Sequence, residues 1–333
     1  MGIPQPVRQA YLEAADDLVH YPDPEAGELR QALAAQARIP AEWIICGNGC
    51  GDLIFSLAAA KKPKRAIVPA PTFAEYEQAL TWAGCEVLHL PLVRAEGFRL
   101  KAAALVALIE DENTRQPVDM LFLCNPNNPT GLALGKEEMR QVAAACKTAG
   151  IFLVVDECFG EFLEDWQEHT MQEELTGNRD LMILKAFTKT YALAGLRLGY
   201  AFCSDEKLLA EMVYGRQPWS VSLPAQRAGL AALSVHGFLA ATRRFLKAER
   251  TWLRQELIKL GYPVYPSEAN YLFFENPDED RRSLFEWCKD RGILIRDCSN
   301  YCGLRKGDYR ISVRTRSENE VLLEVFRSYQ SAV

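Results

Sequence analysis

Short apolar runs alternate with helical stretches along the first two thirds of the chain, and this alternation restricts the fold most strongly. The stretches between the runs have helical periodicity, for example at residues 75–83 and 136–149. Short, continuously apolar strands between helices are typical of a mainly parallel sheet that is covered on both faces. The expected strands are 66–69, 86–90, 120–124, 151–155, 181–184 and 199–202. The sequence therefore predicts an α/β fold, in which ligands bind beyond the carboxyl ends of the strands.

The last third of the chain has a different pattern of apolar and polar residues. Residues 225–259 form one long helical pattern that is rich in Ala, Leu, Arg and Glu. Shorter patterns follow it: the expected strands are 271–274, 293–296 and 309–313, and the expected helices are 283–291 and 317–329. We therefore expect two domains. The large domain comprises residues 22–225, and a smaller α+β domain combines residues 1–21 with residues 226–333.

The composition narrows the class of function. The 333 residues carry 38 basic and 44 acidic side chains, and this net charge of −6 argues against nucleic-acid binding as the main role. The chain has no apolar run of about 18 residues, so we expect no membrane span, and its first residues show no signal-peptide pattern. The ten cysteines form no CxxC pair and no zinc-type cluster with histidine. We expect free thiols, a cytoplasmic protein and no metal site.

Residues 187–200 carry the most specific chemical pattern. Lys189 follows Thr188 and precedes Arg197 by eight residues, in a nearly uncharged segment after a predicted strand. A lysine amine condenses with an aldehyde, whereas a hydroxyl and a guanidinium bind phosphate. A solvated surface lysine is the usual alternative, but a segment this apolar does not suit an exposed loop.

Three further segments place polar groups at the expected ligand edge. Asp156 closes an apolar strand, where a carboxylate is costly unless it meets a cation or a donor. A protonated pyridine nitrogen would serve, and a helix N-cap is the alternative. Residues 125–131 concentrate turn residues at a strand end, and an amide there can bond a ring hydroxyl. Residues 47–52 form a glycine-rich turn before an apolar helix, which suits a phosphate. A lone GxGxG is weak evidence, and the dinucleotide motif GxGxxG is absent.

Together these four segments resemble the fold-type-I pyridoxal-phosphate enzymes, specifically the class I and II aminotransferase group, over nearly the whole chain. The resemblance implies that the large domain binds pyridoxal 5'-phosphate. It implies that Lys189 is the catalytic lysine that holds the cofactor as a Schiff base, and that Asp156 pairs with the pyridine nitrogen. Tyr21 matches a tyrosine that reaches the cofactor phosphate of the neighbouring subunit, which implies a homodimer with composite active sites. The remaining cofactor-binding matches are Asn128 for the ring hydroxyl, Phe73 for ring stacking, and Thr188, Arg197 and the backbone N–H groups of Cys50 and Gly51 for the phosphate.

The chain departs from the wider family at three places. Phe159, three residues after Asp156 and a further cofactor-binding match, stands where aminotransferases usually have a tyrosine bonded to the ring hydroxyl. Ala186 stands where a Ser or Thr often adds a phosphate contact. Residues 2–4 resemble the end of a motif that relatives precede with further residues, which puts the full activity of the chain as given in doubt.

Within the group the chain resembles two sister families that act on phosphorylated amines, the L-threonine-O-3-phosphate decarboxylases of cobalamin synthesis and the histidinol-phosphate aminotransferases. Phe159 and residues 294–301 and 309–315 favour the decarboxylases, whereas residues 185–191 also match some of the aminotransferases. The first resemblance implies release of CO2 and (R)-1-amino-2-propanol phosphate. The second implies that Lys189 removes the Cα proton before amino transfer. A non-catalytic aminotransferase-like regulator and an oxidoreductase on a similar sheet are remoter alternatives.

Anion clamps decide which Cα bond of the substrate breaks. Arg310 matches the substrate-anion arginine of the family, and Arg296 and Arg314 are further candidates for a carboxylate or phosphate. For Arg314 the alternative is a surface ion pair. The expected substrate is therefore a phosphorylated amino acid or amine.

Overall fold

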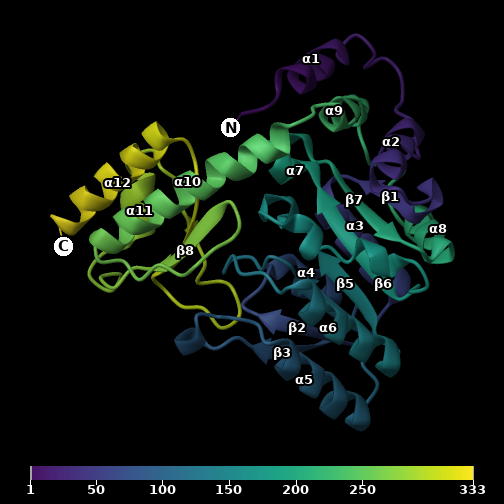
Figure 1. Cartoon of the computed structure of the whole chain (residues 1–333), viewed down its shortest axis with the longest axis horizontal. Coiled ribbons are helices and arrows are strands. Elements are labelled where there is room, and N and C mark those ends of the chain that lie inside the picture. Colours follow the sequence, from purple (N-terminus) through teal and green to yellow (C-terminus); the bar gives the residue numbers. More distant parts are fainter. Residues whose placement is uncertain (1, 333) are drawn as a thin grey trace.

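Two β-sheets organise the chain in the computed structural model, which describes residues 2–332. The larger sheet has seven strands in the order β1-β7-β6-β5-β4-β2-β3 (Figure 1). Its strands are β1 (Ile44–Gly47), β2 (Arg65–Ala70), β3 (Glu86–Pro91), β4 (Met120–Cys124), β5 (Phe152–Asp156), β6 (Leu181–Ala186) and β7 (Gly199–Cys203). Strands β2 to β6 are parallel, and β7 runs antiparallel to both β6 and β1. The predicted mainly parallel sheet is confirmed, and β1 is an edge strand that the sequence pattern did not predict.

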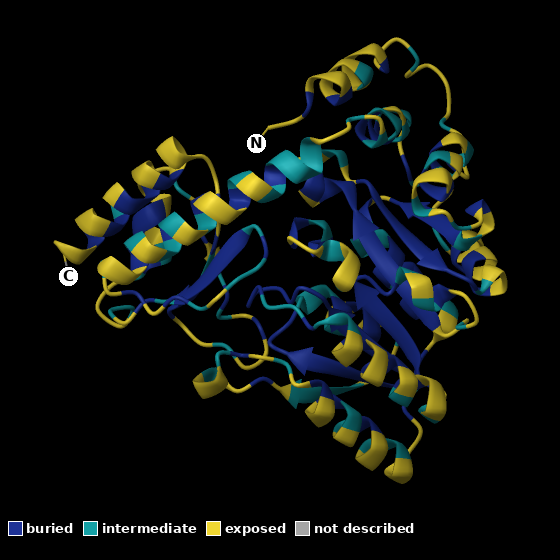
Figure 2. Ribbon diagram, in the orientation of Figure 1, coloured by how far each residue is buried: buried dark blue, intermediate teal, exposed yellow. Residues whose placement is uncertain are grey.

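Helices cover both faces of this sheet, as expected for strands that are apolar on both sides. One face packs on α3 (Gly49–Lys61), α4 (Ala74–Trp82) and α8 (Glu206–Gly215). The other face packs on α2 (Gly27–Ala37), α5 (Ala102–Arg115), α6 (Lys136–Ala149) and α9 (Leu223–Leu233). Successive residues of β4 alternate between the two cores, because strand side chains alternate in direction. Six of the seven strands are accordingly buried, whereas the edge strand β3 and the outer sides of the helices are more exposed (Figure 2).

The smaller sheet is antiparallel, with the order β8-β10-β9. It consists of β8 (Tyr271–Glu275), β9 (Arg296–Asp297) and β10 (Asp308–Ser312), and packs with α10 (Phe238–Lys259), α11 (Leu284–Lys289) and α12 (Arg316–Gln330). This arrangement confirms the predicted smaller α+β unit. Strand β9 is shorter than the predicted strand at 293–296. None of the helices within residues 2–332 is both long and apolar enough to cross a membrane.

The single long helix predicted at residues 225–259 is wrong. The chain forms two helices there, α9 and α10, because it turns at residues 234–237. Gly237, which precedes α10, has a φ of 77°, a left-handed conformation that glycine adopts at little cost. Helix α1 (Gln5–Glu13) lies beside α9 (Figure 1). The domain limits proposed from the sequence remain a prediction.

Polar contacts of two side chains, Arg94 and Tyr271, tie the smaller sheet to the larger one. Arg94, which follows β3, makes two hydrogen bonds to the fully buried Asp308 of β10, at 2.9 and 2.6 Å, and an ion pair with Glu275 of β8 at 2.8 Å. The hydroxyl of Tyr271 on β8 donates to the backbone carbonyl of Asn127 at 2.8 Å. These contacts fix the smaller sheet against the loops at the carboxyl ends of the parallel strands.

Candidate active site

The carboxyl ends of two neighbouring strands, β5 and β6, lead into a cavity that the smaller sheet also lines. Strands β4, β5 and β6 lead directly into the segments that carry Asn128, Phe159 and Lys189. The cavity has a volume of about 660 Å³ and is lined from the large-sheet side by Phe159, Thr188 and Lys189, and from the small-sheet side by Tyr271 and Arg310. The structure therefore brings together the predicted lysine and the predicted substrate arginine, and it does so at the edge where α/β sheets bind ligands.

Lys189 lies in the short helix α7 (Phe187–Thr190), immediately after β6, and its side chain is exposed to the cavity. Its Nζ atom lies 5.6 Å from the centre of the Phe159 ring. Desolvation by the surrounding protein lowers the pKa of Lys189, and the guanidinium groups of Arg310 and Arg197 lower it further, against the opposing effect of Cys158 and Asp156. A lowered pKa increases the fraction of neutral amine, which is the form that attacks an aldehyde.

Asp156 is buried at the end of β5 and accepts two hydrogen bonds. The hydroxyl of Tyr76 donates to its Oδ2 at 2.5 Å, and the backbone N–H of Cys158 donates to its Oδ1 at 2.9 Å. A carboxylate held in this way can stabilise a protonated ring nitrogen. Tyr76 was not identified from the sequence, although it lies three residues after Phe73 and so on the same side of helix α4.

The glycine-rich turn leads directly into helix α3, which begins at Gly49, earlier than predicted. Cys50 and Gly51 therefore lie in its first turn, where backbone N–H groups have no acceptor within the helix. Gly49 has a φ of 77°, and a Cβ atom there would lie 2.6 Å from Nη2 of Arg197. The absence of a side chain at Gly49 thus lets the guanidinium reach the helix end.

This set of groups fits pyridoxal phosphate. The amino-terminal end of α3 and the guanidinium of Arg197 make an anion site that suits the phosphate group. The hydroxyl-bearing Thr188 is buried beside Lys189 and lines the same cavity. The site also provides a carboxylate for the ring nitrogen, that of Asp156, and a lysine with a lowered pKa, Lys189.

Asn128 and Phe159, the residues expected beside a ring hydroxyl, both contact side chains of the smaller sheet. Asn128 is buried, and its Oδ1 accepts a hydrogen bond from Nη1 of Arg310, so its NH2 group is left to donate elsewhere. Phe159 is buried and contacts Tyr271 edge-on, with the ring centres 5.1 Å apart. Tyr271 also lies under the guanidinium of Arg310, at 5.0 Å. The sequence analysis missed Tyr271, which contacts two of the predicted site residues, Phe159 and Arg310, from the smaller sheet.

Neither Phe73 nor Tyr21 lines the cavity around Lys189. Phe73 is the N-cap of α4 and contacts Tyr76 edge-on at 5.4 Å, next to the tyrosine that binds Asp156. Tyr21 is 79% exposed and packs on Trp219 at 4.8 Å, and it does not line the Lys189 cavity of its own subunit. Their roles toward the cofactor remain predictions.

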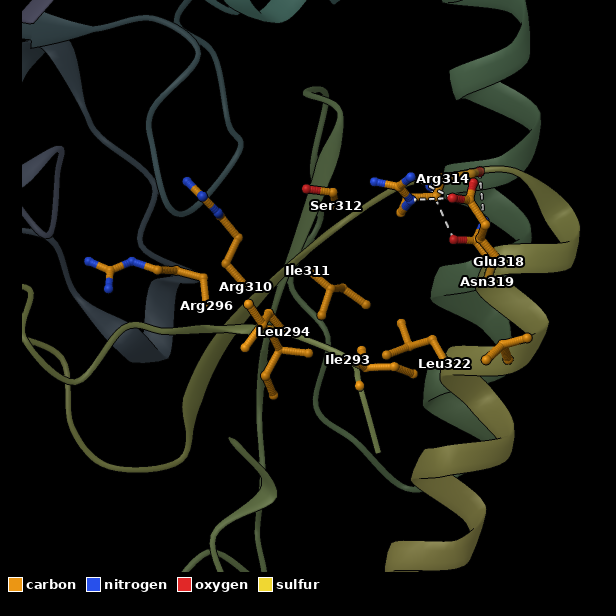
Figure 3. Close-up of a pocket in the computed structure, with 13 residues that line it drawn as sticks. Ile293, Leu294, Arg296, Arg310, Ile311, Ser312, Arg314, Glu318, Asn319 and Leu322 are labelled. Atoms are coloured by element: carbon orange, nitrogen blue, oxygen red, sulfur yellow. Dashed lines mark hydrogen bonds and ion pairs between the residues drawn. The ribbon is translucent and has the colours of Figure 1, made fainter. Parts of the chain in front are cut away.

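The three predicted substrate arginines line a second cavity, of about 640 Å³, on the small-sheet side (Figure 3). Arg296 and Arg310 are paired across β9 and β10 and extend in the same general direction. Arg296 donates to Oδ1 of Asn300 at 2.9 Å. Arg314 turns away from them to Glu318, and its Nε lies 2.8 Å from Oε1. This exposed pair is the surface ion pair considered as the alternative for Arg314, whose substrate role stays a prediction.

Glu75, at the start of α4, is an acidic residue that the sequence analysis did not single out. Burial raises its pKa, while Arg296, Lys189 and Arg310 act in the opposite direction. The carboxyl group therefore lies within the field of the site cations. No local pattern in the sequence marks it, because its neighbours come from distant segments.

The comparisons with known proteins agree with this geometry. The family model for aminotransferase class I and II matches residues 3–326. The chain is 38% identical to a threonine-phosphate decarboxylase from Salmonella typhimurium, over 100% of this chain and 89% of that protein. It is 33% identical to a histidinol-phosphate aminotransferase from Desulfitobacterium hafniense, over 91% and 82% of the two chains.

A solved structure shares the fold and contains the expected cofactor. It is histidinol-phosphate aminotransferase from Sinorhizobium meliloti in complex with pyridoxal-5'-phosphate, with a TM-score of 0.86 and 23% identity, covering 98% of this chain and 88% of that chain. The cofactor of this family, pyridoxal phosphate, is the group that the residues around Lys189 fit. The chain belongs to the class I and II aminotransferase family.

Proposed function

We propose that the protein decarboxylates L-threonine-O-3-phosphate to CO2 and (R)-1-amino-2-propanol phosphate, a step of cobalamin synthesis. The observation that carries the proposal is the 38% identity with a threonine-phosphate decarboxylase along the whole chain. The site supports it chemically, because a substrate with both a phosphate and a carboxylate needs more than one cation, and Arg310 and Arg296 lie side by side.

Each side chain has a definite task in this reaction. Pyridoxal phosphate supplies an aldehyde for the amino group and a ring that accepts the electron pair released at Cα. Lys189 would hold the aldehyde through its amine, and Asp156 would keep the proton on the ring nitrogen. Arg310 and Arg296 bind the substrate anions and so fix which Cα bond stands perpendicular to the ring.

The cofactor phosphate has its own set of ligands. Thr188, Arg197 and the N–H groups of Cys50 and Gly51 hold it at the amino-terminal end of α3. Asn128 donates to the ring hydroxyl, while Phe159 offers that hydroxyl no hydrogen bond and leaves it to Asn128 alone. Phe73 stacks on the ring in this proposal.

A histidinol-phosphate aminotransferase is the second candidate. It is favoured by the 33% identity with such an enzyme from Desulfitobacterium hafniense. In that reaction the same lysine removes the Cα proton, so the cofactor site is common to both candidates. The two differ only in how the substrate anions are held.

We further propose that the enzyme is a cytoplasmic homodimer with composite active sites. Large apolar side chains are exposed around the amino-terminal segment, with exposed fractions of 61% for Leu18, 83% for Val19 and 79% for Tyr21. Exposed apolar groups that gather in one region suit a subunit interface, which would place Tyr21 at the partner's cofactor phosphate. The ten cysteines are all free, in keeping with a reducing compartment.

The decisive assay mixes the purified protein with pyridoxal phosphate and L-threonine-O-3-phosphate and measures CO2 and aminopropanol phosphate. We expect both products in equal amounts. Amino transfer from histidinol phosphate to 2-oxoglutarate without release of CO2 would instead assign the second candidate. If neither reaction occurs although pyridoxal phosphate is bound, both proposals of substrate are wrong.

A further inference from the structure

Two thiols meet inside the proposed cofactor site. Sγ of Cys158 lies 3.2 Å from Sγ of Cys50 and donates a hydrogen bond to it, and Cys50 in turn donates to the carbonyl of Lys185 at 3.1 Å. No other pair of cysteine thiols within residues 2–332 is hydrogen-bonded. We propose that Cys50 and Cys158 form a reversible disulfide on oxidation, and that this modification controls cofactor binding. The second part of the inference rests on the proposed cofactor site.

The geometry favours the bond. A disulfide has an S–S distance of about 2.0 Å, so the two sulfur atoms must approach by only about 1 Å. Gly199 of β7 leaves the space for Cys50, because a Cβ atom at Gly199 would lie 2.9 Å from its Sγ. Cys50 is partly exposed at the start of α3, whereas Cys158 is buried behind it. A small oxidant therefore reaches Cys50 first.

The chemistry balances with a peroxide as the oxidant. The Cys50 sulfur attacks one peroxide oxygen, the O–O bond breaks, water leaves, and Cys50 becomes a sulfenic acid. Cys158 then attacks that sulfur, the S–O bond breaks, and the Cys158 proton leaves with the oxygen as a second water. Two thiols and one hydrogen peroxide thus give one disulfide and two waters.

The hydrogen bond between the thiols favours oxidation of Cys50 before Cys158. It is the largest influence on Cys158, whose pKa it and burial raise well above the usual range. Cys158 therefore keeps its proton and offers it to the Cys50 sulfur.

The disulfide would join two anchors of the cofactor. The backbone N–H of Cys50 belongs to the proposed phosphate site, and the backbone N–H of Cys158 donates to Asp156 at 2.9 Å. Drawing the two sulfur atoms together shifts the start of α3 relative to the segment after β5. We therefore expect the oxidised protein to bind pyridoxal phosphate at least tenfold more weakly than the reduced protein.

The test compares one preparation of the full chain before and after treatment with hydrogen peroxide. Free thiols are alkylated, the protein is digested without reduction, and the peptides are mapped by mass spectrometry. We expect a cross-link between Cys50 and Cys158, a rise in the dissociation constant for pyridoxal phosphate, and reversal of both by dithiothreitol. In the Cys158→Ser variant the cross-link should be absent, whereas Cys302→Ser, which removes an exposed thiol elsewhere, should oxidise like the wild type.

Three outcomes have distinct meanings. Oxidation of Cys50 to a sulfinic acid without a cross-link would overturn the disulfide. A cross-link with unchanged affinity for pyridoxal phosphate would overturn its control of cofactor binding. A reduced protein that forms the cross-link on oxidation but never binds pyridoxal phosphate would support the disulfide and refute the proposed cofactor site instead.

Discussion

The two sides of the Lys189 cavity are built differently. On the large-sheet side, Asp156 is buried, accepts two hydrogen bonds and is held at the end of a strand. On the small-sheet side, the half-buried Arg310 lines the cavity, whereas its exposed neighbour Arg296 lines the second cavity. On the proposed roles, buried groups would hold the cofactor, whereas more exposed arginines would select the substrate. Substitutions on the large-sheet side should therefore lower cofactor capture and kcat, whereas those on the small-sheet side should raise KM.

The largest effect is expected at Lys189. The Lys189→Ala variant should lose covalent capture of pyridoxal phosphate, and its kcat should fall at least about a thousandfold, because both the binding group and the proton carrier are removed. Absorbance of the bound cofactor and a CO2 assay measure the two losses. Lys247→Ala, which alters an exposed lysine paired with Glu164, should leave both unchanged. Retained capture by Lys189→Ala would refute the assigned role.

The next largest effect is expected at Asp156, on the large-sheet side of the cavity. Asp156→Asn should lower kcat by about a hundredfold, since a charge-assisted hydrogen bond contributes about 1.5–3 kcal/mol. Tyr76→Phe should lower it only about tenfold or less, because a single neutral donor to that carboxylate is lost. Steady-state kinetics at saturating cofactor would decide. A Tyr76→Phe effect as large as that of Asp156→Asn would mean that Tyr76 itself touches the cofactor.

On the small-sheet side we expect an effect on substrate binding. Arg310→Ala should raise KM about tenfold to a hundredfold, since one charged hydrogen-bond donor to the substrate is removed. Arg115→Ala is the matched control, because Arg115 lies on α5 in an exposed ion pair with Asp111, and such pairs contribute little. It should change KM by less than about twofold. If the two variants behaved alike, the assignment of the substrate arginine would be wrong.

The pH dependence of cofactor capture links the two sides. Capture needs the neutral amine, so its rate should fall as the pH drops through the pKa of Lys189. Because that pKa is lowered from 10.5, the fall should begin at a lower pH than for an ordinary lysine. Arg310→Gln removes one cation that lowers the pKa, so the fall should move to higher pH. Stopped-flow absorbance measures the rate, and an unchanged profile in Arg310→Gln would contradict the coupling.

The smallest expected effect is at Phe159. In Phe159→Tyr a phenol can donate to the ring hydroxyl, so the absorbance titration of the bound cofactor should shift by up to about one pH unit. The size follows from a net hydrogen-bond contribution of about 1 kcal/mol. A titration that matches the wild type would count against contact between this side chain and the ring hydroxyl.

The sequence predicted the large-sheet side better than the small-sheet side. Asp156 and Lys189 each follow an apolar strand directly, so a local pattern places them at the ligand edge. Tyr76 and Tyr271 escaped notice because their partners, Asp156 and Asn127, lie 80 and 144 residues away in the sequence. No local rule connects residues over such separations.

The errors in the fold have similar causes. The edge strand β1 is only four residues long and is fixed by pairing with β7, far away in the sequence. The break between α9 and α10 depends on the left-handed conformation of one glycine, Gly237, within an otherwise helical composition. Both features are decided by tertiary contacts and by one backbone angle, which hydrophobic periodicity does not report.

The central claim is that Lys189 is the residue that captures the cofactor. Lys185, only four residues earlier, is the nearest competitor, but it is buried beside Glu157 and Glu161, with Nζ–Oε distances of 3.4 and 3.7 Å. Although burial acts to lower it, the two glutamates raise the pKa of Lys185 above its usual value, which keeps the amine charged and unreactive.

Reduction with borohydride in the presence of pyridoxal phosphate, followed by peptide mapping, tests this claim most directly. Borohydride makes the bond between lysine and cofactor permanent, so the modified residue can be read by mass spectrometry. We predict a single stoichiometric modification at Lys189. Modification at Lys185 or at scattered surface lysines, with Lys189 unmodified, would contradict the account.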